Sequence, residues 1–110
     1  MALEVREVDG VAVVALEGDI DLQSSPAVRQ QLLACFDNHT RVVVDLSGVT
    51  YIDSSGVASL VEAFQMARKK NGTFALVNVS SAVMRVLSLA RLDRVFSIHP
   101  SVEAAVAAQG

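Results

Sequence analysis

The chain has 110 residues, of which 52% are apolar, so it can form one domain with a substantial hydrophobic core. Its formal net charge is −3, and it lacks the basic stripe that is typical of a nucleic-acid-binding domain. The longest wholly apolar run, residues 11–16, is much shorter than the roughly 20 residues needed to cross a bilayer.

The first predicted feature is a β-hairpin. Residues 3–8 alternate apolar with charged side chains, as a half-exposed strand does, and residues 11–17 are more apolar. Between them, Asp9-Gly10 is a pair that favours a tight two-residue turn. We therefore expect an antiparallel strand at the edge of a sheet, followed by a buried strand.

A loop and a helix are predicted next. Residues 18–23 form the loop, and Ser25 followed by Pro26 is typical of a helix N-cap and first turn. The helix is expected to end near Asn38. Its apolar stripe includes Cys35, which we assign to core packing; a single cysteine excludes an internal disulfide and favours a reducing compartment such as the cytoplasm.

The central segment is a strand, a turn and a helix. Residues 41–46 are predicted to be a strand buried on both faces, because their apolar residues do not alternate. The turn Asp53-Ser54-Ser55-Gly56 leads into a helix that ends at Asn71-Gly72. The helical spacing places one set of side chains toward the core, namely Val57, Leu60, Val61 and Phe64. It places a second set outward, namely Ser59, Glu62, Ala63 and Met66.

The remaining elements repeat the strand–helix alternation. Residues 73–79 are a predicted strand, Ser80 or Ser81 caps a helix, residues 94–99 form a short strand, and Ser101 begins the last helix. The order β-β-α-β-α-β-α-β-α over residues 1–110 predicts one α/β domain. Its sheet should be mixed, mostly parallel and covered by helices.

Loops that follow parallel strands gather at one rim of the sheet, where functional sites commonly lie. The acidic loop at residues 18–25 and the double-serine turn are therefore expected side by side. A hydroxyl at the start of a helix can cap it. It can also carry a phosphate, which the free amides and the macrodipole favour there. The residues alone leave both interpretations open.

The rim contains no convincing catalytic set, so no enzyme activity, cofactor or metal is predicted. The turn lacks the first glycine of Gly-x-Ser-x-Gly, and His99 is the only histidine expected on this rim. Neither a phosphate-binding loop nor a dinucleotide fingerprint is present. Four carboxylates could supply oxygens to a hard cation, although solvated loop side chains and a cap by Asp53 are the favoured interpretation: Asp19, Asp21, Asp45 and Asp53.

Several motifs resemble those of the STAS domain, the module of anti-sigma factor antagonists and of sulfate-transporter tails. The resemblance extends from Leu3 to about Ala107. It is carried by four segments, of which the Asp-Ser-Ser-Gly turn is the most specific: residues 18–21, residues 43–56, residues 75–79 and residues 83–96.

The resemblance implies a partner switch. In the antagonist branch the serine before the glycine is phosphorylated, which here is Ser55, with Ser54 at the neighbouring hydroxyl position. Asp21 matches an acidic position implicated in phosphorylation and partner contact, and Asp53 opens the motif. The implied partners are an anti-sigma factor with serine-kinase activity, which the unmodified domain binds, and a PP2C-type phosphatase. No nucleic acid partner and no membrane insertion are expected.

We expect the docking surface to combine the rim with the outer face of the central helix. It would include Asp21, Asp53, Ser54, Gly56, Ser59, Glu62 and Met66. A second exposed apolar patch, or cover for the sheet edge, is possible at Met84, Leu89 and Leu92. The alternative function is a STAS subunit of a membrane-lipid ABC transporter that binds the ATPase subunit.

Overall fold

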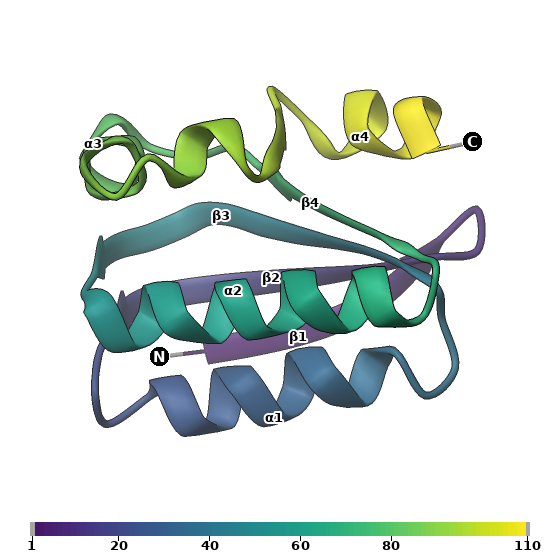
Figure 1. Cartoon of the computed structure of the whole chain (residues 1–110), viewed down its shortest axis with the longest axis horizontal. Coiled ribbons are helices and arrows are strands. Elements are labelled where there is room, and N and C mark those ends of the chain that lie inside the picture. The colour runs from purple at the N-terminus through teal and green to yellow at the C-terminus, as the bar shows by residue number, and fades with distance from the viewer. Residues whose placement is uncertain (1, 110) are drawn as a thin grey trace.

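The computed structural model describes residues 2–109 and contains one five-stranded sheet with helices on both faces (Figure 1). The predicted order of strands and helices is confirmed, with one short 3₁₀ helix in addition. The elements are β1 (Ala2–Val8), β2 (Val11–Ile20), α1 (Ser25–Cys35), β3 (Arg41–Ile52), α2 (Ser54–Lys69), β4 (Thr73–Val77), α3 (Ser81–Leu89), η1 (Leu92–Arg94), β5 (Ser97–His99) and α4 (Val102–Gln109).

The strands lie in the sheet in the same order as in the sequence, β1-β2-β3-β4-β5. β1 pairs with β2 in antiparallel fashion and every other pair is parallel, so the predicted edge strand and mostly parallel sheet are confirmed. The hairpin turn has positive φ at Asp9 (51°) and Gly10 (80°), which is the backbone that a two-residue turn between twisted strands requires.

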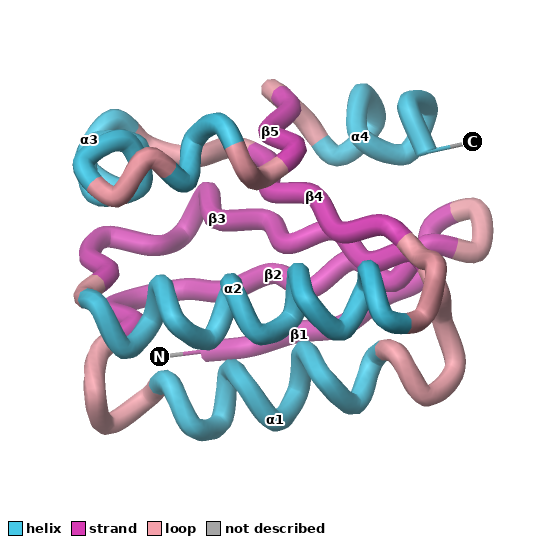
Figure 2. The backbone as a smooth tube through the Cα atoms, viewed as in Figure 1, coloured by secondary structure: helices cyan, strands magenta, loops and turns pink. Residues whose placement is uncertain are grey.

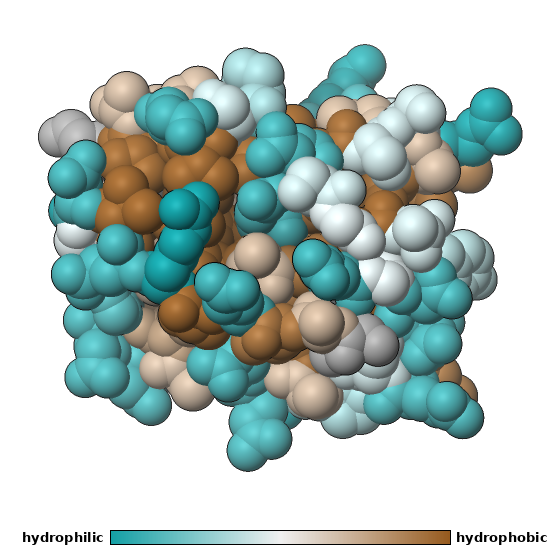
Figure 3. Space-filling model, turned by 180° about the vertical axis from the view of Figure 1, so that it is seen from behind, coloured by the Kyte–Doolittle hydropathy of each residue, from teal (hydrophilic) through white to brown (hydrophobic). Residues whose placement is uncertain are grey.

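This strand order explains why three helices share one face. Parallel crossovers are right-handed, so successive crossovers that advance in one direction place their helices on the same side of the sheet. The larger core cluster accordingly contains residues of α1, α2 and α3, with α1 and α2 side by side (Figure 2). The other face has a smaller cluster that α4 covers with Val102 and Ala105. When the molecule is seen from behind, apolar side chains are visible among polar ones on its surface (Figure 3).

Two strands run further than predicted. β2 continues to Ile20 and β3 to Ile52, and the two residues pair at the end of the ladder. In the sequence, the polar residues and the glycine between Leu46 and Ile52 favour a loop. In the structure, two register shifts let this segment stay paired with β2. The chain therefore leaves the two strands at Asp21 and Asp53.

Helix ends agree with prediction at some positions and not at others. Ser25 is the first residue of α1 rather than its cap, and α1 ends at Cys35 instead of Asn38. Asn71 does adopt the left-handed conformation, with φ 56°. Ser80 caps α3 by accepting the amide of Val83 at 3.2 Å. Cys35 is buried in the core, as predicted.

Candidate functional site

The carboxyl ends of β2 and β3 bring the acidic loop and the double-serine turn together. The Asp53 amide donates to the Ile20 carbonyl at 3.1 Å, so the chain leaves both strands at the same place. The predicted juxtaposition at this rim is confirmed. We define the rim as residues 19–24 together with residues 50–55.

Asp53 organises the turn. Its Oδ1 accepts the amides of Ser55 at 2.9 Å and Gly56 at 3.1 Å, and also the Ser55 hydroxyl at 2.6 Å. The Ser55 hydroxyl is the main cause that lowers the pKa of Asp53, followed by the Gly56 amide, because each hydrogen bond favours the ionised carboxylate. Asp53 is thus the N-cap of α2, and neither serine serves as the cap.

The two serines differ in exposure. Ser54 is exposed, whereas Ser55 is half-buried and lines a groove of about 540 Å³ between α1 and α2. Ser55 is therefore not enclosed in the core, and it borders a space open to solvent. No histidine lines this groove, so a Ser–His catalytic pair has no geometric support here.

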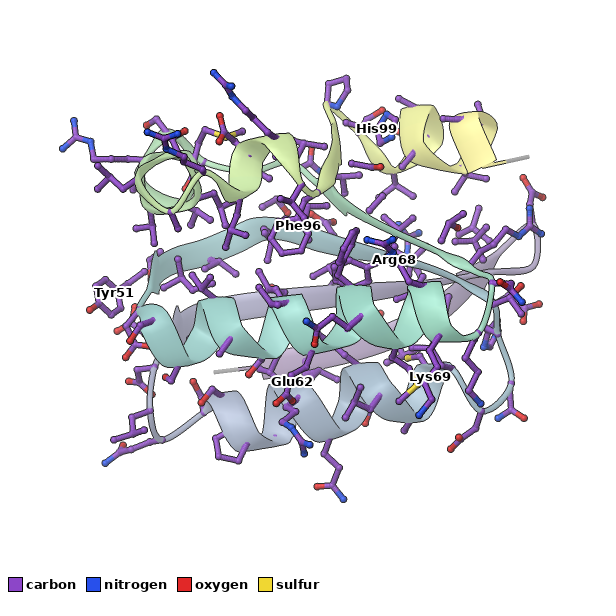
Figure 4. The ribbon with its side chains drawn as sticks, viewed as in Figure 1. Tyr51, Glu62, Arg68, Lys69, Phe96 and His99 are labelled. Carbon is purple, nitrogen blue, oxygen red and sulfur yellow. The ribbon has the colours of Figure 1, made fainter. Side chains whose placement is uncertain are left out.

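The walls of the groove come from both helices. Pro26, Arg29 and Gln30 of α1 face Ala58 and Glu62 of α2. The Arg29 Nε donates to the Glu62 carboxylate across the groove, and both side chains are about half exposed. Glu62 points from α2 toward α1 (Figure 4). No sequence motif singles out Arg29, although the buried positions Val28 and Leu32 leave it on an exposed flank of α1.

Three residues predicted for the docking surface are more buried than an outward-facing position requires, although Ser59 still lines the groove. Ser59 is buried where α1 and α2 meet, with its hydroxyl 3.2 Å from the Ser25 carbonyl and 3.1 Å from that of Ser55. Gly56 is buried against Ile20 and Ile52, and Met66 is partly buried against the larger core cluster.

Ala63, also predicted to face outward, is fully buried. The reason is that α2 packs on the sheet and on α1 at once, so its buried arc is wider than a single apolar stripe. Val61 and Phe64, expected to face the core, are only partly buried. Glu62 lies at the groove, as the predicted outward face requires.

The acidic loop is held in one shape by its own hydrogen bonds. The Asp21 Oδ1 accepts the amides of Gln23 at 3.0 Å and Ser24 at 3.1 Å, and the Ser24 hydroxyl accepts the Asp21 amide at 2.9 Å. Nearby, the Thr50 hydroxyl donates to Asp19 Oδ1 at 2.7 Å. A shallow hollow of about 430 Å³ opens on this loop, lined by Asp19, Asp21, Gln23 and Ser24.

A metal site does not form from these carboxylates. Asp45 bonds instead to the Ser47 amide at 3.0 Å and the Asn78 amide nitrogen at 3.1 Å. Burial raises the pKa of Asp45, but these hydrogen bonds together lower it below its ordinary value. Within residues 2–109, no three His, Cys, Asp or Glu side chains group closely enough to hold a metal ion.

The three residues of the possible second apolar patch, Met84, Leu89 and Leu92, differ in exposure. Leu89 is 81% exposed, but Leu92 and Met84 are half-buried and Leu92 packs on the larger core cluster. None of the helices in residues 2–109 combines the length and apolar character needed to cross a membrane.

Comparison with known proteins settles the family. The family model of the STAS domain matches residues 2–105. This chain belongs to the STAS domain family. The anti-sigma-B factor antagonist of Bacillus subtilis (strain 168) is 27% identical to this STAS domain over 104 residues, covering 94% of this chain and 95% of the relative.

Two solved structures are similar to this STAS domain throughout. The anti-sigma factor antagonist from Mycobacterium paratuberculosis is 32% identical with a TM-score of 0.88, covering 98% of this chain and 92% of the other. A putative anti-sigma factor antagonist from Thermotoga maritima has a TM-score of 0.91 at 24% identity, covering 97% and 93%. The second likeness shows the fold alone.

Proposed function

We propose that this STAS domain is an anti-sigma factor antagonist that works as a phospho-switchable binding module and not as a catalyst. Unmodified, it sequesters an anti-sigma factor that is also a serine kinase; phosphorylated on Ser55, it releases that partner. A PP2C-type phosphatase restores the first state, and the cycle runs in the cytoplasm. The names of the full-length relatives support the function, and the Asp-Ser-Ser-Gly turn supports the site.

The position of the Ser55 hydroxyl is the observation that carries this proposal. Ser55 lines an open groove at the first turn of α2, and its hydroxyl donates a hydrogen bond to Asp53. The helix dipole at that turn favours a negatively charged group. Ser54 is more exposed than Ser55, so the choice between the two serines rests on the family motif and must be tested directly.

A phosphate at Ser55 would act by charge. It adds about −1.5 to −2 charges at neutral pH. Asp53 is ionised at that pH, as an aspartate ordinarily is, so the new charge is placed beside an existing one. A partner that complements the unmodified acidic rim then faces excess negative charge, and like-charge juxtaposition at an interface costs several kcal/mol.

The switch does not require refolding. Asp53 caps α2 through two backbone amides, and these contacts do not involve the Ser55 hydroxyl. The surface residues proposed to contact the partner are Asp21, Asp53, Ser54 and Glu62. Ser59, Gly56 and Met66 would act indirectly, because they fix α2 against its neighbours.

The test uses purified anti-sigma factor kinases of the source organism with Mg-ATP. We expect intact-mass measurement to show one added phosphoryl group and fragmentation to map it to Ser55. Ser55→Ala should bind the kinase but stay unmodified, whereas the matched Ser54→Ala should be modified normally. Ser55→Glu should weaken binding. Phosphate confined to Ser54, no phosphate with any such kinase, or an ATP-insensitive complex with a transporter ATPase would overturn the proposal.

A further inference from the structure

A second pocket lies at the β5 edge of the sheet, at the opposite end of α2 from Ser55. β5 pairs with residues 75–77 of β4, so their ladder does not extend to Thr73 and Phe74 at the start of that strand. The pocket lies against this shorter ladder and has a volume of about 460 Å³, which is within the range of roughly 300–1,000 Å³ that is typical of small-molecule sites. We call it the edge pocket, and its aromatic and polar lining residues are Phe64, Arg68, Thr73, Phe74, Ser97 and His99.

The apolar wall of the edge pocket is aromatic and is held in place from behind. Phe74 is buried and Phe64 is half-buried, and both rings pack on Phe96. The ring centroids of Phe64 and Phe96 are 5.7 Å apart in an edge-to-face arrangement, and those of Phe74 and Phe96 are 6.0 Å apart. Because this cluster fixes the rings in advance, a flat apolar ligand could pack on them at little cost in side-chain entropy.

Arg68 supplies the positive charge of the edge pocket. Its guanidinium carbon lies 5.9 Å from the centroid of the Phe64 ring, so the cation is placed over the aromatic wall. Arg68 points from α2 toward β4, whereas the adjacent Lys69 points toward α1 (Figure 4). Among the described residues, no carboxylate forms an ion pair with Arg68, and neither Asp nor Glu lines the pocket. The edge pocket is therefore cationic in a chain whose net charge is −3.

The other polar groups of the edge pocket can form hydrogen bonds to a bound anion. Thr73 and Ser97 each bring a hydroxyl, and His99 brings a ring nitrogen. One guanidinium matches one carboxylate through two parallel N–H···O bonds. Arg68 is the one permanently charged side chain among the described residues that line the pocket, so a monoanion is neutralised there, whereas a phosphate dianion would keep excess charge.

We propose that the edge pocket binds a small aromatic monocarboxylate. The carboxylate lies on Arg68, and the ring packs against Phe64 and Phe74. This inference goes beyond the proposed function and does not depend on it, because it uses neither Ser55 nor the rim. A ligand held in this way would connect the last turn of α2 to the open end of β4.

Titration of the full chain with phenylacetate, followed through backbone amide shifts in NMR spectra, tests the site. We expect saturable shifts confined to the surroundings of the edge pocket, with a Kd of about 1 mM or below. Phenylacetamide lacks the charge and should bind about tenfold more weakly, because it loses the charge-assisted hydrogen bonds to Arg68. Cyclohexylacetate keeps the carboxylate but not the flat ring, and it should also bind more weakly than phenylacetate.

Two variants complete the test. Arg68→Met keeps the length of the side chain and should raise the Kd for phenylacetate about tenfold. Lys69→Met is the matched control, because it removes the neighbouring cation that points away from the pocket, and it should leave Kd unchanged. Both residues are exposed, so both variants should fold with the melting temperature of wild type.

Each contrary result has a distinct meaning. Equal Kd values for phenylacetate and phenylacetamide, or for Arg68→Met and Lys69→Met, would overturn the assignment of a carboxylate to Arg68. Cyclohexylacetate binding as tightly as phenylacetate would overturn the choice of an aromatic ligand. Shifts elsewhere in the domain, or shifts that do not saturate, would overturn the site itself. All of these results would leave the proposed function standing, since that function is tested at Ser55 with the kinase.

Discussion

Gly56→Ala should destabilise the domain, although alanine is the better helix former. A Cβ at this position would lie 2.7 Å from side-chain atoms of Ile20 and of Ile52, and 2.9 Å from the Ile20 carbonyl oxygen. Overpacking of this kind typically costs about 1–3 kcal/mol, and the carbonyl belongs to the sheet and cannot move freely. Alanine recovers up to about 1 kcal/mol through helix propensity. Three contacts below 3.0 Å place the cost in the upper part of that range, so the net loss should be about 1–2 kcal/mol.

Urea and thermal unfolding measure this loss. For a chain of 110 residues, about 1–2 kcal/mol corresponds to a fall in melting temperature of about 4–9 °C. Ser54→Ala, an exposed change in the same turn, is the control and should stay within about 0.5 kcal/mol of wild type. Gly56→Ala with wild-type stability would refute the packing argument. If that variant also lost its partner, Gly56 would be a contact residue after all.

Three further changes test the surroundings of the site. Ser59→Ala should lower the free energy of unfolding by about 1 kcal/mol in urea titrations, because it removes a buried hydrogen bond between α1 and α2; a loss no greater than that of Ser54→Ala would contradict this. Asp53→Asn should be less stable than wild type at about pH 6, and this deficit should narrow as the pH falls toward about 3. The reason is that the pKa of Asp53 is lowered in the folded state, so the carboxylate contributes its full stability above the unfolded value of about 3.9 and loses it as the pH falls through the lower folded value. If the difference in melting temperature between Asp53→Asn and wild type did not change with pH, the lowered pKa of Asp53 would be contradicted. Asn71→Gly should leave the unfolding free energy nearly unchanged, whereas Asn71→Ala should reduce it by about 1 kcal/mol at this left-handed position, and equal values for the two would exclude a conformational cause.

Local signals predicted much of the fold. The Asp9-Gly10 turn, a serine cap at Ser80 or Ser81 and a helix end near Asn71 each depend on a few neighbouring residues, and the structure has the turn, the cap at Ser80 and a left-handed Asn71 just after α2. The extension of β3 to Ile52 could not be predicted in this way, because it depends on bulged pairing with the distant residues of β2. The meeting of the two rim loops followed from topology, which the alternation of elements specifies.

The site was harder to predict than the fold. Ser59 and Ala63 were placed on the outer face because periodicity describes one packed stripe, whereas α2 has two neighbours. The small size of these two side chains could have indicated a contact between helices, since small residues let helices approach closely. Arg29 could have been found from the outer face of α1, but its pairing with Glu62 depends on how the two helices lie together.

The single-helix cover of the second face affects how the protein must be made. α4 follows all five strands in the chain, and its Val102 and Ala105 pack in the same cluster as Val13, Val43 and Ala75 on that side. During synthesis these two valines and the alanine are not covered by α4 until the ribosome has released that helix. A stalled or prematurely terminated chain would therefore expose an apolar sheet surface that is prone to aggregate. We expect chaperones to bind such intermediates.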